Sequence, residues 1–497
     1  MNGIRALALA VIALASTGAA GVAAGLDGIW RIDMPKKWGV TLHTYLILRL
    51  EGEKLDGSVV VNDSNRIPIR NPHEESGESV FGMDWGWTFR VRPSGPNLHV
   101  LITYGSSGTD ETTAVPASES EIAPPLVLPL PALRELPSNG LARTPPMGWN
   151  SWNHFAERVD DKVVREAADA MVASGMAAAG YTYINIDDTW EASRDASGAI
   201  SCNSKFPDMA ALAAYVHSKG LKIGIYSSPG PHTCGGYEGS YGHEAQDAST
   251  YAAWGIDYLK YDWCSAGRIY QRPDLRAVYQ KMGDALQHCG RPIVYSLCEY
   301  GMGDVWTWGP EVGANLWRTT GDIQDNWKSM SHIGFDQGRL APYAAPGHWN
   351  DPDMLEVGNG GMSMTEYRTH FSLWCMLAAP LMAGNDLRAM SQEARDILTN
   401  REVIAIDQDS LGHQASRASA KEGIEVWTRP LHDGSAAVAV FNRTDAPQTT
   451  AFAWNEVGLS AQPTKVRDLW RHTDLPVIEA TFTSEVPAHG VLLLKAR

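Results

Sequence analysis

The stretch Tyr258-Leu259-Lys260-Tyr261-Asp262-Trp263-Cys264 is a short, mostly apolar run that ends by presenting a carboxylate. Lys260 precedes Asp262 by two residues, so both side chains point to the same face of a β-strand. A cation beside a carboxylate lowers the pKa of the acid and keeps it ionised, which is the state that a nucleophile needs. An ion pair that merely closes a strand is the more common use of such a pair, so other residues have to decide.

Polar side chains also follow the other short apolar runs in the middle of the chain. Asp187 and Asp188 come directly after the run that ends at Ile186, and Arg318 and Asp322 come after another. The same holds for Ser227, Ser228, Glu299, Asn350, Asp351 and Asp353. One acid after a strand is commonplace, but this many after successive strands indicate a functional site if the fold brings those ends together.

The elements that carry these residues alternate between strands and helices from Arg143 to about Asp407. Asp160 and Asp161 can cap the first helix, and strands and helices then follow in the order 181–186, 209–218, 221–226, 245–254, 258–261, 274–287 and 292–297. This rhythm favours an α/β fold, a (β/α)8 TIM barrel, which usually has about 250 residues and carries its catalytic groups at the carboxyl ends of its strands. A doubly wound sheet is the alternative, but no G-x-G-x-x-G follows the first strand.

Two further β domains are expected to flank the barrel. Apolar and β-branched runs separated by turn signals predict an extra N-terminal all-β domain over residues 25–113. Residues 114–142 are rich in proline and predict a linker to the catalytic barrel at 143–411. Alternating strands return over residues 412–497 and predict a C-terminal antiparallel β-sandwich domain. Trp85 and Trp87 of the first domain could contact sugar, although core packing is the more common role of such residues.

Residues 1–24 have the pattern of a signal peptide. Arg5 precedes an apolar run from Ala6 to Ala15, and small residues lead up to Gly25. The run is short for a bilayer span, so we expect a secreted or periplasmic protein with no membrane span in the mature chain, and a retained N-terminal anchor is the alternative. A net charge of −16 argues against nucleic acid and anionic membranes as partners.

Two kinds of chemistry could use so many carboxylates. Asp187-Asp188 and the Asp351/Asp353 pair resemble hard-cation ligands, but histidine is missing from these strand ends apart from His348, so we expect no metal and no cofactor. The six cysteines could form disulfides after export, and their spacing matches no zinc pattern. A glycosidase would use two carboxyls for chemistry and the other acids to bind hydroxyls. Aromatic residues that could pack on a sugar are Trp149, Trp152, Trp190, Tyr226 and Trp263.

Seven motifs in one order carry a resemblance to a known family. The chain resembles the α-galactosidases of glycoside hydrolase family 27, the melibiases, from about Leu141 to the C-terminus. The motifs are 145–152 (PPMGWNSW), 186–190 (IDDTW), 222–226 (KIGIY), 258–264 (YLKYDWC), 296–300 (SLCEY), 317–322 (WRTTGD) and 349–354 (WNDPDM). The N-terminal β domain lies outside the minimal unit of this family.

The resemblance implies a role for each matching residue. Asp262 would be the nucleophile and Asp322 the general acid/base of a retaining exo-glycosidase that acts on a terminal α-galactoside. Asp187, Asp188 and Trp152 would bind the 4- and 6-hydroxyls of the sugar. The remaining substrate-binding residues would be Tyr226, Lys260, Cys264, Glu299, Arg318 and Asp353, with a Cys234–Cys264 disulfide beside the site.

The implied mechanism is a double displacement through an aspartyl-glycosyl intermediate. It requires that burial and neighbouring charge keep Asp322 protonated while Asp262 is ionised. The bulk of Glu299 favours galactose over N-acetylgalactosamine, and the Asp187-Asp188 pair weighs against β-L-arabinopyranosides. An isomaltose-releasing glucanase and a non-catalytic carbohydrate-binding protein stay open as alternatives.

The sequence departs from the animal members of the family at one disulfide. Where they have a partner for the cysteine at position 298, this chain has Ala314, so we expect Cys298 to be free. The natural glycan, the role of the N-terminal domain, the pairing of Cys202 and Cys289, and the oligomeric state are not specified by the sequence.

Overall fold

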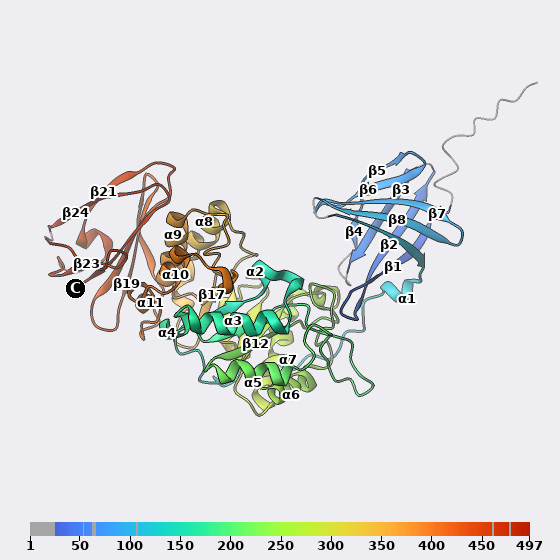
Figure 1. Ribbon diagram of the computed structural model, residues 1–497, viewed down its shortest axis with the longest axis horizontal. Helices are drawn as coiled ribbons and strands as arrows, with labels where there is room; N and C mark the ends of the chain where they lie inside the picture. The colour runs from blue at the N-terminus through green and yellow to red at the C-terminus, as the bar shows by residue number, and fades with distance from the viewer. Residues whose placement is uncertain (1–24, 53, 62–65, 106–107, 460–461, 477–478) are drawn as a thin grey trace, which may run out of the picture. The chain divides into compact units, whose positions relative to one another are not determined.

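The computed structural model describes residues 25–52, 54–61, 66–105, 108–459, 462–476 and 479–497, and the expected signal peptide lies outside them. The described residues form two compact units (Figure 1). The first unit contains residues 25–35 and 41–124, and the second contains 36–40 and 125–497. The short segment Lys36–Val40 is therefore part of the same unit as the barrel, although it connects two strands of the first unit.

The first unit is built on one antiparallel sheet with nine strands among its described residues. Its order is β4-β3-β2-β1-β9-β8-β7-β6-β5. The strands are β1 (Gly28–Pro35), β2 (Thr41–Glu51), β3 (Lys54–Val61), β4 (Ile67–Pro68), β5 (Arg70–Glu75), β6 (Glu78–Gly82), β7 (Trp87–Ser94), β8 (Asn97–Tyr104) and β9 (Thr109–Pro116), followed by helix α1 (Glu119–Ile122). The all-β prediction is thus confirmed, and β9 crosses the expected domain boundary at residue 113.

Side chains of this sheet are buried on both of its faces. In β2, Leu46 and Leu48 belong to one hydrophobic cluster, whereas Tyr45 and Ile47 belong to another that includes Ile122 of α1. Because successive side chains of a strand point to opposite faces, these alternating residues fill two separate cores. β5, with the sequence RNPHEE, is mostly exposed and carries no apolar alternation, so its residues do not show the pattern of a half-buried strand.

The second unit contains the predicted barrel. Residues 143–411, all of which are described, contribute eight parallel strands in the order β16-β15-β14-β13-β12-β11-β10-β17. A parallel bridge between Leu355 and Ala383 joins the two ends of this order, so the sheet closes on itself. The strands are β10 (Met147–Asn150), β11 (Tyr183–Asn185), β12 (Lys222–Ser227), β13 (Tyr258–Asp262), β14 (Val294–Cys298), β15 (Leu316–Arg318), β16 (Trp349–Asp351) and β17 (Leu381–Ala383).

Helices follow the strands and several begin at a side-chain cap. The Asp160 side chain accepts a hydrogen bond from the Val163 N–H, as predicted, and Asp208 and Ser363 cap two further helices in the same way. The helices are α2 (Trp152–Phe155), α3 (Asp161–Ala173), α4 (Met176–Ala179), α5 (Met209–Ser218), α6 (Glu244–Trp254), α7 (Leu275–His288), α8 (Trp327–Phe335), α9 (Met364–Leu377), α10 (Gln392–Leu398) and α11 (Arg401–Asp407).

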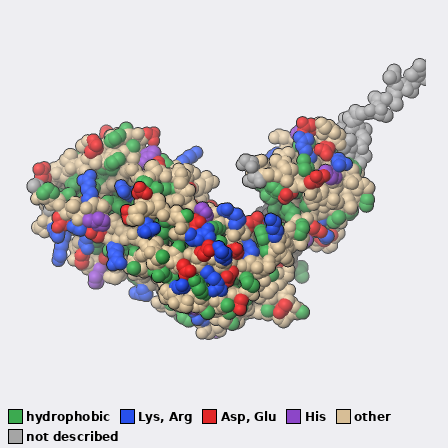
Figure 2. Space-filling model, viewed as in Figure 1, with side chains coloured by type: hydrophobic (Ala, Val, Ile, Leu, Met, Phe, Trp, Pro, Cys, Tyr) green, Lys and Arg blue, Asp and Glu red, His purple; other side chains and the backbone are tan. Residues whose placement is uncertain are grey.

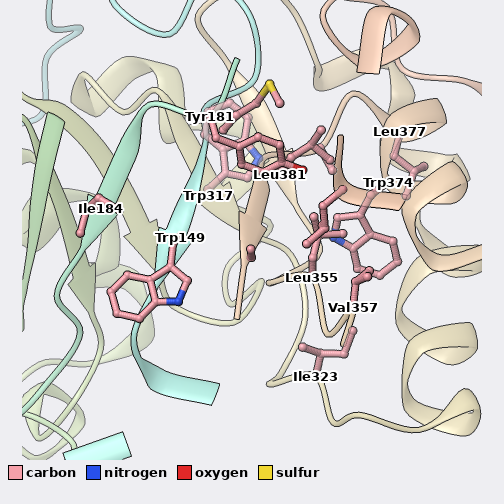
Figure 3. Close-up of a cluster of buried hydrophobic side chains, with 14 of the residues drawn as sticks. Trp149, Tyr181, Ile184, Trp317, Ile323, Leu355, Val357, Trp374, Leu377 and Leu381 are labelled. Carbon is pink, nitrogen blue, oxygen red and sulfur yellow. The ribbon is translucent and has the colours of Figure 1, made fainter. Parts of the chain in front are cut away.

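Helix α9 lies in the middle of the largest hydrophobic core. It is buried along almost its whole length, and Figure 3 shows its Trp374 and Leu377 together with Trp149, Trp317 and Leu381 of the barrel strands. On its other side the same core includes Trp427 and Phe441 of the C-terminal sheet. Phe335 at the end of α8 joins the two parts through an edge-on contact with Phe441 at 5.3 Å between ring centroids.

The C-terminal part is an antiparallel β-sandwich, as predicted. Its six-stranded sheet has the order β18-β19-β20-β25-β22-β23, and a two-stranded sheet of β21 and β24 packs over it. Val438 and Val440 of β20 face the sandwich core, while Ala439 and Phe441 face the barrel helices. The strands are β18 (Ser416–Lys421), β19 (Ile424–Pro430), β20 (Ala436–Asn442), β21 (Gln448–Ala453), β22 (Val466–Asp468), β23 (Thr473–Asp474), β24 (Thr481–Val486) and β25 (Val491–Ala496).

The proline-rich stretch after α1 contains no helix or strand between residues 123 and 146. Residues 125–142 nevertheless belong to the second unit, where the Leu136 N–H bonds to the Glu311 carbonyl and Gln280 bonds to Ala132 and Arg134. This part of the expected linker is therefore fixed to the barrel.

The surface carries both signs of charge. Acidic and basic side chains are interspersed on the face of the second unit that Figure 2 shows. Among the described helices none has the length and apolar character needed to cross a membrane.

Candidate active site

Neighbouring strands of the barrel present the predicted polar residues at one end. β12, β13 and β14 pair in parallel, with Ser227 beside Tyr261 and Asp262 beside Cys298. β15 and β16 continue the series, with Arg318 beside Asp351. Because all eight strands run in one direction, their carboxyl ends meet at one end of the barrel. The side chains that the sequence places after separate strands therefore surround a common centre.

Asp262 is a carboxylate of this centre with hydrogen-bond donors on both of its oxygens. It is buried at the end of β13 and accepts three hydrogen bonds. One oxygen accepts from the Tyr300 hydroxyl and the Trp263 N–H, both at 2.7 Å, and the other accepts from the Tyr226 hydroxyl at 3.1 Å. These donors hold both oxygens in place and so fix the orientation of the carboxylate.

The sequence predicts that the pKa of Asp262 lies below its usual value, and this prediction is wrong. Burial raises the pKa of Asp262 above its usual value, and this exceeds the opposing effects of the Lys260 ammonium and of the hydrogen bonds from Tyr300 and Trp263. Lys260 acts in the predicted sense, but its ammonium donates to Asp187 at 2.8 Å rather than to Asp262. The sequence could not reveal this, because Asp187 comes from a different strand.

Asp187, which is buried, and Lys260, which is partly buried, form an ion pair beside Asp262. The Asp187 oxygen that accepts from Lys260 also accepts from the Asn150 amide at 2.7 Å. Burial lowers the pKa of Lys260, but the charges of Asp187, Cys298 and Asp262 raise it by more. The pKa of Lys260 therefore lies well above its usual value. Lys260 therefore stays a cation that a sugar hydroxyl could contact.

Asp188 is buried beside Asp187 and has one free oxygen. Its Oδ2 accepts from the Gly235 N–H at 2.6 Å, while its Oδ1 has no hydrogen-bond partner among the described residues. Burial raises the pKa of Asp188 to about 7, against the hydrogen bonds from Thr233 and Gly235. A buried carboxyl oxygen without a partner is costly, so a hydroxyl group of a ligand is the natural complement to it.

Arg318 connects the acids on the opposite side of the centre. It is buried on β15 and donates to Asp322 at 3.0 Å, and it also forms an ion pair with Asp353 at 3.1 Å. Asp353 has a φ of +96° and accepts a hydrogen bond from the Ile323 N–H. Asp353 follows β16 by two residues, and strained backbone of this kind is common at functional sites.

Asp322 is the exposed carboxylate of the group. Its side chain is 71% exposed, so the burial that its expected role requires is not provided by the described residues. Arg318 is the last residue of β15, Asp322 lies four residues later on the following loop, and the guanidinium fixes the carboxyl position.

Glu299 and Tyr300 follow β14. Glu299 is fully buried, and neither carboxyl oxygen has a hydrogen-bond partner among the described residues. Burial raises the pKa of Glu299 well above its usual value. Tyr300 has a φ of +59° and was not among the predicted site residues, although it stands in the motif Ser296 to Tyr300.

The remaining predicted residues also lie near these strand ends. Trp152 is half-buried at the start of α2, and its N–H donates to Asn150. The disulfide between Cys234 and Cys264 is present, and the four other cysteines, including Cys298, are unpaired. Among the described residues one group of potential metal ligands occurs, Cys234, Asp262 and Cys264, but the sulfur atoms of this group are bonded to each other and are not thiolates.

Tyr300 and Asn150 carry two side chains of the site that sequence reasoning missed. Each contacts a predicted carboxylate directly, and each stands at the end of a barrel strand inside a motif.

A closed parallel barrel with aligned carboxylates, hydroxyl donors and a buried cation at its carboxyl end is the active-site end of a glycoside hydrolase.

Comparisons with known proteins identify the family. Residues 144–409 match the sequence model of α-galactosidase A, and residues 421–496 match that of the α-galactosidase C-terminal β-sandwich domain. The α-galactosidase of Cyamopsis tetragonoloba is 49% identical over 72% of this chain and 87% of its own length. The α-galactosidase A of Cellvibrio japonicus is 48% identical over 71% of this chain and 92% of its own length. The chain belongs to the α-galactosidase family, glycoside hydrolase family 27.

Solved structures agree with this assignment. The crystal structure of α-galactosidase I from Mortierella vinacea superposes with a TM-score of 0.70 at 38% identity, and the match covers 72% of this chain and 98% of that one. Neither family model reaches the first unit.

Proposed function

We propose that this chain hydrolyses terminal α-linked galactose from oligosaccharides or glycoconjugates, with retention of the anomeric configuration. The observation that carries the proposal is the buried Asp262 carboxylate, whose two oxygens are fixed by Tyr226, Tyr300 and Trp263. A carboxylate held in this way among sugar-binding acids is the arrangement that a glycosyl-enzyme intermediate needs. A protein that only bound sugar would not need a second, exposed carboxyl such as Asp322.

In the first step an oxygen of Asp262 attacks the anomeric carbon. The bond from this carbon to the leaving oxygen breaks while Asp322 gives its proton to that oxygen, so the leaving group departs as an alcohol. In the second step Asp322, now a carboxylate, takes a proton from water, and the resulting hydroxide equivalent displaces Asp262 from the anomeric carbon. Two inversions give net retention, and both carboxyls return to their starting state.

The exposure of Asp322 is compatible with this role once substrate is bound. A sugar and its leaving group would cover the open side of the carboxyl and exclude water from it. Arg318 donates a hydrogen bond to Asp322 and forms an ion pair with Asp353, so it can hold the acid while a hydroxyl of the sugar takes up its remaining donors.

Sugar recognition would use the acids of β11 and the cation of β13. The free Oδ1 of Asp188 and the Asp187–Lys260 pair can bind the 4- and 6-hydroxyls, with Trp152 on the sugar face. The loop after β14 would face the 2-hydroxyl. Glu299 fills this loop with a buried side chain, which favours galactose over N-acetylgalactosamine.

Release assays with p-nitrophenyl glycosides test the proposal. Wild-type protein should hydrolyse the α-galactoside faster than the α-N-acetylgalactosaminide, the β-L-arabinopyranoside and an isomaltoside, and NMR should detect the α anomer of galactose first. Appearance of the β anomer first would contradict the retaining mechanism. Galactose binding without turnover would instead support a carbohydrate-binding protein, and loss of activity in EDTA would support metal-dependent hydrolysis.

We also propose that the protein is exported. The supporting observations are the signal-like pattern of residues 1–24 and the Cys234–Cys264 disulfide, a bond that is rare in reducing compartments. Edman sequencing of protein from the culture medium should give an N-terminus near Gly25, and an intact N-terminus on cell-bound protein would contradict cleavage.

A further inference from the structure

A strained residue stands directly after the two sugar-binding acids. Thr189 is a buried, β-branched residue with a φ of +83°, a conformation that is an outlier for such side chains. All three of its polar groups are held. Its N–H donates to Glu191 at 3.1 Å, its carbonyl accepts from Asn203 at 2.8 Å, and its hydroxyl accepts from the Lys205 ammonium at 2.7 Å. We call these four residues the Thr189 clamp.

The Thr189 clamp fixes the backbone that aims Asp188. Lys205 is anchored a second time, because its ammonium also donates to the Glu157 carbonyl at 2.8 Å. Glu191 is fully buried, so its contact with the Thr189 N–H is shielded from water. A shift of Thr189 toward an unstrained conformation would rotate the preceding peptide and move the Asp188 carboxyl.

A second support holds the other side of Asp188. The turn from Thr233 to Tyr237 is closed by two hydrogen bonds between these two residues, at 2.8 and 3.0 Å. Gly235 in this turn donates its N–H to the Asp188 carboxyl, and Cys234 joins the turn to β13 through the disulfide. Tyr237 is buried, and its hydroxyl is the group through which the turn contacts the segment Lys36–Val40.

The segment Lys36–Val40 touches both supports through one side chain. The Trp38 indole N–H donates to the Tyr237 hydroxyl at 2.8 Å, and the Lys205 ammonium lies 4.6 Å from the centroid of the Trp38 ring. The Trp38 carbonyl accepts from the Ser204 N–H, and Lys36 forms an ion pair with Glu157 at 3.1 Å. Because Lys205 already occupies the ring by a cation–π contact, Trp38 is a structural element rather than a sugar platform.

We propose that Trp38 is a positioning residue of the active site. It holds the Thr189 clamp and the Thr233–Tyr237 turn together, and it thereby sets the position of Asp188 and the preference of the enzyme for a sugar with a C6 hydroxyl. The inference rests on the proposed function, in which Asp188 binds that hydroxyl. Trp38 lies outside residues 144–409, so the part of the chain that matches the family does not supply this support by itself.

The test compares two substrates that differ only at C6. A p-nitrophenyl α-D-galactoside and the corresponding β-L-arabinopyranoside have the same ring configuration, but the second lacks the CH2OH group. For Trp38→Ala we expect kcat/KM for the galactoside to fall about tenfold, mostly through KM, while the arabinopyranoside value changes little, because one aligned hydrogen bond is lost. The ratio of the two values is the readout, since general loss of folded protein lowers both equally.

Further variants locate the effect. Trp38→Phe keeps a ring beside Lys205 but removes the donor to Tyr237, so its ratio should lie between those of wild type and Trp38→Ala. Lys205→Met should also lower the ratio. The variant that combines Trp38→Ala with Lys205→Met should lower the ratio by less than the product of the two single effects, because the two residues act through the same contact. Trp85→Ala is the matched control, because Trp85 is a 44% exposed tryptophan of the first unit and should leave the ratio unchanged.

An unchanged ratio in Trp38→Ala would overturn the inference, whether or not the melting temperature falls. Equal losses on both substrates would also overturn it, because they would assign Trp38 to general stability. A wild-type protein that does not hydrolyse the galactoside would instead refute the proposed function, which is a separate outcome.

Discussion

At the scale of single residues, the balance between burial and hydrogen bonding decides the state of each carboxyl. Asp262 and Asp188 are both buried, and burial raises the pKa of each, but Asp262 has donors on both oxygens whereas Asp188 has one oxygen without a partner. A fully bonded carboxylate is suited to nucleophilic attack, and a partly bonded one is suited to binding a hydroxyl.

Replacing Asp262 with asparagine tests the nucleophile. The amide keeps the size of the side chain but cannot form the glycosyl-enzyme, so turnover should fall by a factor of about a thousand or more on every α-galactoside, whatever its leaving group. The far-ultraviolet circular dichroism spectrum should be unchanged. Near-normal kcat with the wild-type spectrum would show that another residue is the nucleophile.

Replacing Asp322 with alanine should give a different pattern, because its proton matters most for a poor leaving group. Turnover of natural oligosaccharides should fall at least about a hundredfold, whereas the first step on a 2,4-dinitrophenyl galactoside should be nearly unaffected. Rapid-quench kinetics separates the two steps. Equal losses on both substrates would argue against Asp322 as the general acid.

At the scale of elements, helix α9 ties the site to the core and carries a buried titratable group. His370 is fully buried, and its Nε2 accepts from the Glu356 N–H at 3.1 Å. Burial lowers the pKa of His370 to about 3, against an ordinary value of about 6.5. The imidazole is therefore neutral in the folded protein throughout the mildly acidic range.

This burial predicts a specific acid sensitivity. Between pH 6.5 and 3 the unfolded chain binds a proton at His370 that the folded protein does not, so the free energy of unfolding falls as the pH decreases, by about 1.4 kcal/mol per unit from this group. In His370→Gln, whose Oε1 can replace Nε2 as acceptor, that contribution should vanish. Urea unfolding at pH 6 and pH 5 measures the difference, and equal pH slopes for wild type and variant would contradict it.

At the scale of the whole molecule, the described residues contain separate cores that predict separate unfolding transitions. The barrel and one face of the C-terminal sheet share a single core, whereas the core of the nine-stranded sheet contains residues of the first unit alone. Elements that share a core unfold together, and the C-terminal sandwich should therefore melt with the barrel.

Calorimetry should resolve two transitions, and galactose should distinguish them. Only the second unit contains the proposed site. Galactose at a hundred times its Kd should therefore raise the free energy of unfolding of the second unit by about 2.7 kcal/mol and leave the melting temperature of the first unit unchanged. The Asp188→Ala variant is the control, since it should lose most of this shift. A single transition that moves as a whole would show that the two units unfold cooperatively.

Much of the fold follows from local sequence patterns. The helix expected at residues 209–218 has those bounds, and the barrel strands expected at 181–186, 221–226, 258–261 and 292–297 begin and end within two residues of those positions. In the first unit the exposed sequence of β5 lacks apolar alternation, so no local pattern predicts this strand. The stretch 125–142 was expected to be a linker, but it packs on the barrel through backbone hydrogen bonds that proline content does not reveal.

The sequence by itself determined the barrel, the sandwich, the family and the set of residues at the strand ends, because periodicity and motifs are properties of neighbouring residues. Only the tertiary structure decided how these residues pair. Lys260 donates to Asp187 instead of Asp262, and the Tyr300 hydroxyl donates to Asp262. Asp322 stays exposed, and Trp38 contacts Tyr237, which belongs to the turn that supports Asp188. The physical reason is that desolvation and hydrogen bonding depend on atoms brought together from distant segments, and no local pattern records which of them will meet.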